Sequence, residues 1–375
     1  MGSVYLDYAA TAPLLPEVRE RMAQFLGDPL GNPSSLHAHG RRARMALEEA
    51  RERCAAALGV LVEEIVFTSG GTESDNLALV GVLDGAPPGS HFLVSAVEHP
   101  AVLERARILG ERHRLEVIPV DPEGRVSPDS VAERLRADTA LVSVMAANNE
   151  VGTLQPVAEL GALCRQRGVL FHVDAVQHPG LQPDRLGIDL MSLSGHKLGA
   201  LPGSGLLFVR RGVRLAPLLR GGGQEDHRRA GTPSLPAAVS LGLALSRPPE
   251  GDRLEGLRAH LERGIAEGVP GARLLAGAVP RVSHLSAWLF DRLPAEPILV
   301  RLDLEGISAS SGSACSSHSL EPSRVLQAMG WSEEESRGLV RFSLGWGSQP
   351  RDVDRLLETL PGILTDLLQA RLSRR

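Results

Sequence analysis

Short apolar runs that alternate with amphipathic stretches are the feature of this sequence that most constrains its fold. Each run has the length of a buried strand, and most runs end in a polar turn that leads into a helical pattern. The expected strands are residues 64–68, 91–97, 115–120, 141–146, 169–173, 188–193 and 205–209. Strand–helix units of this length require right-handed crossovers between parallel strands. The pattern therefore predicts an α/β fold with a mostly parallel seven-stranded sheet that helices cover.

Helices are expected where apolar residues recur every three or four positions. In residues 41–58 these positions include Leu47 and Cys54, and Gly59 follows as a stop signal. The other helices are expected after the 69–76 turn as far as residue 83, and at residues 100–110, 127–135, 157–167, 253–267, 321–329 and 353–372. Cys54 and Cys164 fall on the apolar sides of two of these helices, so both are predicted to be core residues.

The length of the chain predicts two domains. A chain of 375 residues is longer than one ordinary hydrophobic core supports. The proline-rich stretch Arg247-Pro-Pro-Glu-Gly251 has the composition of a boundary. We expect residues 13–250 to form a large α/β domain, and residues 1–12 and 251–375 to form a smaller α+β domain.

Composition and charge exclude several classes of protein. The net charge of −5 and the scattered arginines argue against nucleic-acid binding. No apolar stretch approaches the ~18 residues of a membrane span, and the first residues resemble no export signal. The three cysteines lack CxxC spacing, so they predict neither a disulfide framework nor a metal site. We expect the protein to work in a reducing cytoplasm.

A single lysine occurs among the 40 lysine and arginine residues of the chain. This residue, Lys197, ends the polar turn Ser194-Gly-His-Lys197, directly after the apolar run 188–193. An amine can lose its proton and attack a carbonyl, whereas the guanidinium of arginine stays protonated. Because strand ends carry ligand sites in α/β sheets, we predict that Lys197 forms a Schiff base with pyridoxal phosphate and is not an incidental surface lysine.

Two further strand ends carry residues suited to a phosphorylated pyridine. Gly70, Gly71 and Thr72 open a helix, where free N–H groups and the helix dipole favour a phosphate. A plain N-cap turn is the alternative for these residues, and the GxGxxG spacing of a dinucleotide site is absent. Asp174 follows an apolar strand, where a protonated pyridine nitrogen would compensate its charge.

Three polar side chains near other strand ends are weaker candidates for the same site. His99 could stack its imidazole on the cofactor ring, although a structural capping role is the more common one for such a histidine. Asn149 and Gln177 could donate hydrogen bonds to the ring oxygen.

Two residues of the C-terminal part suggest substrate chemistry. Cys315 lies in Ser308-Ala-Ser-Ser-Gly-Ser-Ala-Cys-Ser-Ser317, which shows neither helical nor strand periodicity. A thiol in such a loop is a candidate nucleophile. Arg341 interrupts the otherwise apolar strand 339–344, where an inward guanidinium would bind an anion such as a substrate carboxylate.

These motifs together resemble the cysteine desulfurases, which are fold-type-I pyridoxal-phosphate enzymes of the class-V aminotransferase family. The resemblance extends from Tyr5 to about Leu344. Its motifs are Tyr5-Leu-Asp-Tyr-Ala-Ala-Thr11, Phe67-Thr-Ser-Gly-Gly-Thr-Glu-Ser-Asp-Asn76, Glu98-His99, Asn148-Asn-Glu-Val-Gly152, His172-Val-Asp-Ala-Val-Gln177, Ser194-Gly-His-Lys197, Arg229-Ala-Gly-Thr232 and Ser310-Ser-Gly-Ser-Ala-Cys315. The last motif resembles the branch with a long mobile cysteine loop. One departure is Ala200-Leu-Pro-Gly203, where the family usually has a Gly-Pro-Lys-Gly-type turn.

The resemblance implies a role for each cofactor residue. Lys197 binds the cofactor and later moves the Cα proton. Asp174 pairs with the pyridine nitrogen, and His99 stacks on the ring and acts as an acid or base. The other implied contacts are Asn149 and Gln177 at the ring oxygen, and Gly71, Thr72, Ser194, His196 and the Thr232 of a neighbouring subunit at the phosphate. The contact from Thr232 implies a homodimer.

The resemblance also implies the reaction. Asn149 and Arg341 bind L-cysteine, and Cys315 of the smaller domain takes the substrate sulfur as a persulfide and leaves L-alanine. The sulfur then passes to an acceptor, such as an iron–sulfur scaffold or a sulfur relay protein, for iron–sulfur cluster, thio-cofactor or tRNA synthesis. Three alternatives stay open: a class-V aminotransferase, a selenocysteine lyase, or a non-catalytic subunit that keeps the cofactor.

Overall fold

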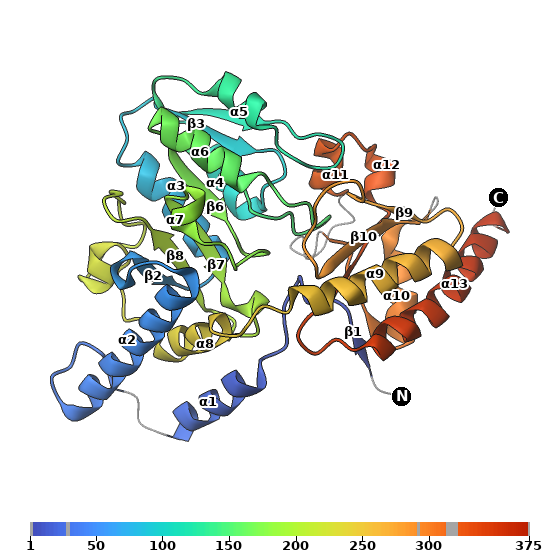
Figure 1. Cartoon of the computed structure of the whole chain (residues 1–375), viewed down its shortest axis with the longest axis horizontal. Coiled ribbons are helices and arrows are strands. Elements are labelled where there is room, and N and C mark those ends of the chain that lie inside the picture. Colours follow the sequence, from blue (N-terminus) through green and yellow to red (C-terminus); the bar gives the residue numbers. More distant parts are fainter. Residues whose placement is uncertain (1–2, 28–30, 291–292, 313–321, 374–375) are drawn as a thin grey trace.

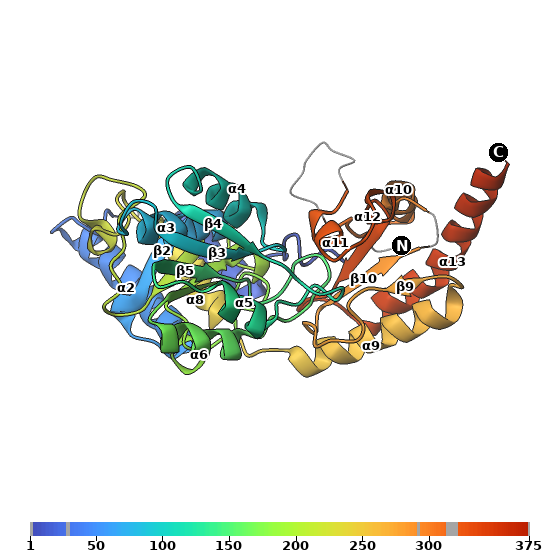
Figure 2. The ribbon, with the colours of Figure 1, turned by 90° about the horizontal axis from the view of Figure 1, so that it is seen from above.

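Two layered bodies make up the part of the chain that this computed structural model describes, residues 3–27, 31–290, 293–312 and 322–373. A seven-stranded sheet forms the centre of the larger body, and a three-stranded sheet forms the centre of the smaller one (Figure 1). Figure 2 shows the two bodies side by side, with helices above and below the larger sheet. Within the described ranges, no helix is long and apolar enough to cross a membrane.

The larger sheet confirms the predicted α/β fold. Its order is β2-β8-β7-β6-β5-β3-β4. The strands are β2 (Ile65–Thr68), β3 (His91–Ser95), β4 (Arg114–Ile118), β5 (Thr139–Ser143), β6 (Leu170–Asp174), β7 (Leu190–Ser194) and β8 (Gly205–Val209). Strand β8 is antiparallel to both of its neighbours, and all other pairings are parallel. Six strands therefore run in one direction and end at one edge.

Helices bury both faces of this sheet. Alternate residues of β3 show the two faces: Leu93 packs in an apolar cluster with α2, α6 and α8, whereas Phe92 and Val94 pack in another with α3 and α4. The helices are α2 (Ala38–Leu58), α3 (Gly71–Leu83), α4 (Pro100–Leu109), α5 (Pro128–Arg134), α6 (Val157–Arg167), α7 (Pro183–Leu186) and α8 (Leu235–Leu245), with 3₁₀ turns η1 (Val62–Glu64), η2 (Gly195–Lys197) and η3 (Gln224–His227). Cys54 and Cys164 are fully buried in the first cluster, which confirms that both are core residues.

Three helices of this body were not predicted: the short α7, and two longer ones. Helix α1 (Pro16–Gly27) and helix α8 both pack against their neighbours, α1 on α8 and α8 along α2. The sequence of α8 is apolar on nearly every side, so its periodicity gives no amphipathic signal. Buried helices of this kind are recognised only through their packing partners.

The smaller body has its own apolar core. Its sheet has the order β12-β10-β9 and is antiparallel, and its core includes Trp288, Phe342 and Leu356. The elements are α9 (Gly251–Gly268), β9 (Arg273–Leu274), β10 (Leu285–Leu289), α10 (Ala295–Leu304), β11 (Ile307–Ser308), α11 (Arg324–Ala328), α12 (Glu333–Ser336), β12 (Leu339–Ser343) and α13 (Pro350–Leu372). The separate cores support the proposed domain division, whose boundaries stay a prediction.

The first residues of the chain connect the two bodies. Strand β1 (Val4–Tyr5) pairs in parallel with β11, and the Ser343 backbone N–H donates to the Leu6 carbonyl at 2.7 Å. Further along, the Ala12 N–H donates to the His196 carbonyl of the larger body at 2.8 Å. The stretch between these contacts, residues 7–12, is called the N-terminal crossing segment below.

Candidate active site

The candidate residues of the larger body gather at the edge where its parallel strands end. Strands β2, β3, β5, β6 and β7 run in the same direction, and each is followed by one or more of these residues. The carboxyl ends of parallel strands are the usual ligand edge of an α/β sheet. The N-terminal crossing segment lies across this edge.

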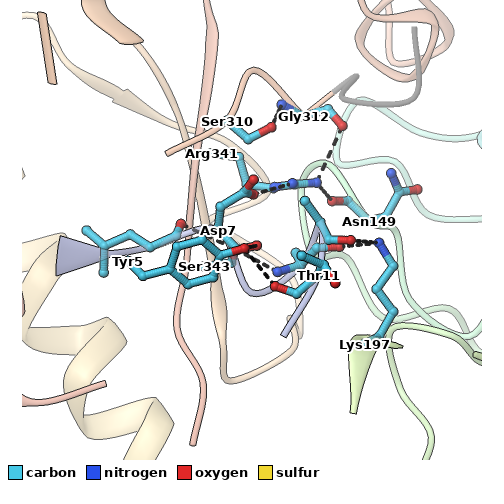
Figure 3. Close-up of polar contacts among 12 residues, drawn as sticks. Tyr5, Asp7, Thr11, Asn149, Lys197, Ser310, Gly312, Arg341 and Ser343 are labelled. Atoms are coloured by element: carbon cyan, nitrogen blue, oxygen red, sulfur yellow. Dashed lines mark hydrogen bonds and ion pairs between the residues drawn. The ribbon is translucent and has the colours of Figure 1, made fainter. Parts of the chain in front are cut away.

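Lys197 lies in the 3₁₀ turn η2, directly after strand β7. Its side chain is half-buried, and its Nζ donates to the carbonyl oxygens of Ala9 at 2.7 Å and Ala10 at 2.6 Å. Figure 3 shows this amine pointing at the N-terminal crossing segment. The only primary side-chain amine of the protein is thus held at the ligand edge.

Asp174 ends strand β6 and is 5% exposed. Its Oδ1 accepts a hydrogen bond from the Val176 N–H at 2.9 Å. Burial raises the pKa of Asp174, whereas this hydrogen bond and the positive charges of His99 and Lys197 lower it. A cationic ligand atom next to Asp174 would therefore keep it ionised.

Asp75 of helix α3 is almost fully buried and lies close enough to Asp174 for the two to interact electrostatically. Burial and the charge of Asp174 raise the pKa of Asp75 well above its usual range, and a hydrogen bond with Ser192 opposes the rise. The Nε2 of His172 lies 3.6 Å from Asp75 Oδ1, but burial lowers the pKa of His172 to about 3, so this contact is not an ion pair. The pKa values of both acids are therefore raised, that of Asp75 further, and the positive charges near Asp174 favour its ionised form over that of Asp75.

A third buried acid, Glu98, follows strand β3. Its Oε1 accepts hydrogen bonds from Ser95 Oγ at 2.5 Å and from the Met145 N–H at 2.6 Å. Burial raises the pKa of Glu98 to about 8, and the charge of Asp174 adds to this rise. Burial thus favours the protonated form of Glu98 near pH 7, and Asp174 is the acid of the three that has the charges of His99 and Lys197 beside it.

The glycine turn before helix α3 lies against the Lys197 turn. A Cβ on Gly71 would lie 3.4 Å from the Ser194 Cβ, and a Cβ on Gly205 would lie 2.5–2.7 Å from the backbone of Gly70. Only glycine allows this close approach. The first N–H groups of α3 and the exposed Thr72 thus lie near Ser194 and form a cradle for an anion.

The structure also locates the three weaker candidates of the larger body. His99 is the N-cap of α4, and its Nδ1 accepts from the Ala101 N–H at 3.1 Å, which is the capping role considered above. The Gln177 Nε2 donates to the Ala9 carbonyl at 2.9 Å, next to Lys197. The Asn149 carbonyl accepts from the smaller body, as described below.

The two remaining phosphate candidates occupy different surroundings. The His196 Nδ1 lies 3.2 Å from Thr11 Oγ1, and burial and the charge of Lys197 lower the pKa of His196 to about 4. Thr232 is exposed on the loop whose Arg229 forms an ion pair with Glu73 at 2.8 Å, in the first turn of α3. The predicted contact of Thr232 with a second subunit stays a prediction.

Arg341 of strand β12 brings the smaller body to the ligand edge. Its Nη2 lies 2.8 Å from Asp7 Oδ1, and its Nη1 donates to the Asn149 carbonyl at 2.7 Å and the Gly312 carbonyl at 3.4 Å. The residue is 1% exposed. Asp7, Asn149 and Arg341 meet in Figure 3, close to Lys197. The predicted carboxylate-binding arginine thus lies at the same site as the predicted Schiff-base lysine.

One predicted site residue lies outside the described part of the chain, and three residues of the site were not predicted. Cys315 lies outside the described residues, so its predicted role as a nucleophile stays a prediction. Asp7, Asp75 and Glu98 were not predicted to contribute to the site. The isolated carboxylate in the apolar stretch Tyr5-Leu-Asp-Tyr8 was the one available signal for Asp7, because a charge there needs a buried partner.

Comparisons with known proteins agree with this geometry. The chain matches the aminotransferase class-V family over residues 4–356. Cysteine desulfurase IscS from Dictyoglomus turgidum is 44% identical over 375 aligned residues, which cover 97% of this chain and 95% of the relative. Cysteine desulfurase NifS from Azotobacter vinelandii is 42% identical over 377 aligned residues, which cover 98% and 94%.

Solved structures give the same result. A NifS-like protein superposes with a TM-score of 0.89 at 32% identity and covers 97% of this chain and 99% of its own. SspA in complex with cysteine superposes with a TM-score of 0.82 at 33% identity and covers 91% and 99%. The fold is that of fold-type-I pyridoxal-phosphate enzymes. The chain therefore belongs to the class-V aminotransferase family, and its relatives there are cysteine desulfurases of the IscS and NifS kind.

Proposed function

We propose that this protein is a cysteine desulfurase that converts L-cysteine to L-alanine and takes up the sulfur on Cys315. The observation that carries this proposal is the position of the only lysine, Lys197, at the ligand edge beside the buried Asp174. The cysteine desulfurases among its relatives support the same reaction.

The residues at the ligand edge fit pyridoxal phosphate. The Nζ of Lys197 would hold the aldehyde carbon, and Asp174 would pair with the pyridine nitrogen. The cradle of Gly71, Thr72 and Ser194 suits a phosphate because it combines helix N–H groups with hydroxyl donors. When bound, pyridoxal phosphate supplies an electron sink that stabilises negative charge at the substrate Cα.

The charges around Asp174 favour that electron sink. Asp75 and Glu98 have pKa values raised by burial, so they add no negative charge near pH 7. The carboxylate of Asp174 then compensates one positive charge, the protonated ring nitrogen. His99 lies close enough to Asp174 to affect its charge and is proposed to stack on the ring and move protons.

Arg341 and Lys197 are proposed to act on different groups of the substrate, its carboxylate and its Cα proton. Arg341 has a buried Nε–H without a hydrogen-bond partner among the described residues, and such a donor favours an incoming carboxylate. Asn149 lies beside Arg341 and is proposed to contact the substrate as well. The amine of Lys197 would be the base that takes the Cα proton of the substrate.

The sulfur transfer is assigned to Cys315. Its thiolate attacks the substrate sulfur, an S–S bond forms, and the Cβ–S bond of the substrate breaks. The electron pair of that bond stays with the carbon fragment, which takes up a proton and leaves as L-alanine. A second thiolate, on a sulfur-acceptor protein, then removes the outer sulfur of the persulfide.

The proposal includes a homodimer and a reducing compartment. Thr232 is exposed and therefore available to the phosphate cradle of a second subunit. Cys54 and Cys164 are buried free thiols, which suits a reducing cytoplasm. The sulfur acceptor is proposed to be an iron–sulfur scaffold or a sulfur relay protein.

Incubation of the pure protein with L-cysteine tests the proposed function, with alanine and protein-bound persulfide measured together. We expect both products in equal amounts in a first turnover without added thiol. Cys315→Ala should lower this turnover at least ~10³-fold, because the nucleophile is lost. Cys54→Ala and Cys164→Ala are the matched controls, since burial raises the pKa of each thiol to about 12 and keeps it unreactive.

The outcome also separates the alternatives. Near-normal alanine formation by Cys315→Ala would refute the desulfurase mechanism and favour a lyase or an aminotransferase. Formation of alanine and selenide from selenocysteine only would identify a selenocysteine lyase. No reaction with any of these amino acids, although the cofactor is bound, would favour the non-catalytic subunit.

A further inference from the structure

The N-terminal crossing segment contacts the guanidinium of Arg341 and the amine of Lys197. Its Asp7 carboxylate binds Arg341, and its Ala9 and Ala10 carbonyls accept from the Lys197 amine (Figure 3). The segment thus occupies the positions where the carboxylate and the amine of an amino acid are expected to bind.

The hydrogen bonds of Arg341 show which of its donors remain. A guanidinium carries five N–H groups. The Nη1 donors bind the Asn149 and Gly312 carbonyls, and Nη2 binds Asp7 Oδ1 at 2.8 Å. The Nε–H is buried and has no partner in the described part of the chain. Asp7 therefore binds Arg341 through one oxygen only and leaves the guanidinium incompletely satisfied.

Asp7 is the only carboxylate that the structure brings to within ion-pairing distance of Arg341 among the described residues. The Arg341 side chain is 2% exposed, so its buried charge needs a compensating carboxylate, and Asp7 is the one in direct contact with it. The backbone of Asp7 cannot withdraw easily, because the Ser343 N–H donates to the Leu6 carbonyl and Ser343 Oγ accepts from the Ala9 N–H. An arriving carboxylate must therefore compete with Asp7 at a fixed backbone position.

We propose that Asp7 is a specificity-determining residue that competes with the substrate carboxylate for Arg341. Two carboxylates on one guanidinium repel each other, and the attraction of Arg341 is shared between them. Asp7 thus orients the guanidinium and compensates its charge in the resting protein, and it weakens the binding of every amino acid that uses Arg341. This inference rests on the proposed role of Arg341 in substrate binding.

Equilibrium binding of L-alanine and ethylamine tests the proposal. Ethylamine is L-alanine without the carboxylate, and neither carries sulfur, so the cofactor absorbance reports binding without turnover. We expect Asp7→Asn to lower the Kd of L-alanine at least about fivefold and to leave the Kd of ethylamine within about twofold. Asp7→Glu, which keeps the charge, should bind both ligands nearly as the wild type does.

The outcomes separate competition from a merely structural role. An unchanged or higher Kd of L-alanine in Asp7→Asn would overturn the proposal, and so would a parallel change for both ligands, which indicates a displaced segment. If Asp7→Asn does not fold, the same ratio is measured with Asp7→Ser. Arg341→Gln is the control for the underlying role: if it keeps the wild-type preference for L-alanine over ethylamine, Arg341 does not bind the carboxylate, and the failure lies in the proposed function.

Discussion

At the scale of single residues, the site depends on groups whose charge is set by burial. Asp174, Asp75 and Glu98 are three carboxyl groups in one buried region, and they cannot all be ionised there. Burial favours the protonated forms of Asp75 and Glu98, whereas the charges of His99 and Lys197 favour the ionised form of Asp174, which is proposed to pair with the ring nitrogen of the cofactor. The division of charge is thus a property of the protein before any ligand binds.

Lys197 gives the first prediction at this scale. Borohydride reduction of the cofactor-loaded protein should attach the cofactor to Lys197 and to no other side chain, because the chain has no second lysine. Peptide mapping by mass spectrometry measures the label. Lys197→Arg keeps the positive charge and should take up no label. A label on any other peptide, or none on yellow wild-type protein, would refute this assignment.

Glu98 gives a prediction about pH. Its pKa is raised from 4.5 to about 8, so between these values the folded state holds a proton that the unfolded state has lost. Folding stability from this group is therefore complete below pH 4.5 and falls as the pH rises towards 8. Relative to Glu98→Gln, the wild type should lose stability between pH 5 and pH 8, by at most ~1.4 kcal/mol per pH unit.

Urea denaturation at several pH values measures this difference. Glu104→Gln is the control, because the ion pair of Glu104 with Arg324 lowers the pKa of Glu104 and moves its titration below this pH range. A constant stability difference between Glu98→Gln and the wild type from pH 5 to pH 8 would show that Glu98 is ionised in the folded protein.

At the scale of elements, strand β8 and the glycine turn after β2 are in direct contact. Gly205 begins β8, and its Cα lies so close to Gly70 that a Cβ would come within 2.5–2.7 Å of three backbone atoms. The atoms that a methyl group on Gly205 would meet belong to the backbone of Gly70 and not to a flexible side chain. Either β8 or the glycine turn must therefore move to admit the methyl group.

Gly205→Ala should therefore disturb the phosphate cradle. We expect a loss of stability of about 1–3 kcal/mol and a weaker affinity for pyridoxal phosphate, by about tenfold. Titration of the apoprotein with the cofactor measures the affinity. Gly362→Ala in helix α13 is the matched control, because a Cβ there meets no atom within 4 Å and alanine favours the helix. Normal cofactor affinity in Gly205→Ala would show that the cradle does not bind the phosphate.

Elements with a clear period could be predicted from the sequence, and those defined by distant contacts could not. The seven strands and helix α2 have strong apolar patterns, and the structure confirms them to within a few residues. The reversed direction of β8 and the uniformly apolar helix α8 leave no local signal. For the site, the polar residues at the strand ends and the single lysine of the chain indicated that the cofactor binds at the ligand edge of the sheet. Asp7 could not be assigned, because its partner Arg341 is 334 residues away.

At the scale of the whole molecule, a buried ion pair joins the loop that carries Thr232 to helix α2. The Glu225 carboxylate binds Arg51 of α2 at 2.7 Å, with Glu225 almost fully buried. Met45 of the same helix is 72% exposed, which is unusual for a large apolar side chain on a helix. This surface is the one that we expect to bind the second subunit.

Met45→Glu should dissociate the proposed dimer and release the cofactor, because a buried charge at an interface is costly and Thr232 would lose its partner. Sedimentation velocity and cofactor absorbance measure the two effects. Leu372→Glu is the matched control, since Leu372 is also 72% exposed but lies on α13, at the opposite end of the molecule (Figure 1). A monomer that keeps one cofactor per chain would contradict the dimer.

The N-terminal crossing segment has a consequence for synthesis of the protein. Leu6 and Ala9 leave the ribosome long before their partner Ser343, which follows 334 residues after Ala9. The larger sheet can form much earlier, since all its strands lie before residue 210. Until Ser343 emerges, the N-terminal crossing segment lacks the contacts that fix Leu6 and Ala9, and only its contacts with the larger body hold it at the ligand edge. The amine of Lys197 is thus less well covered until Ser343 contacts the segment, and during that time it is more open to reaction with aldehydes than in the folded protein.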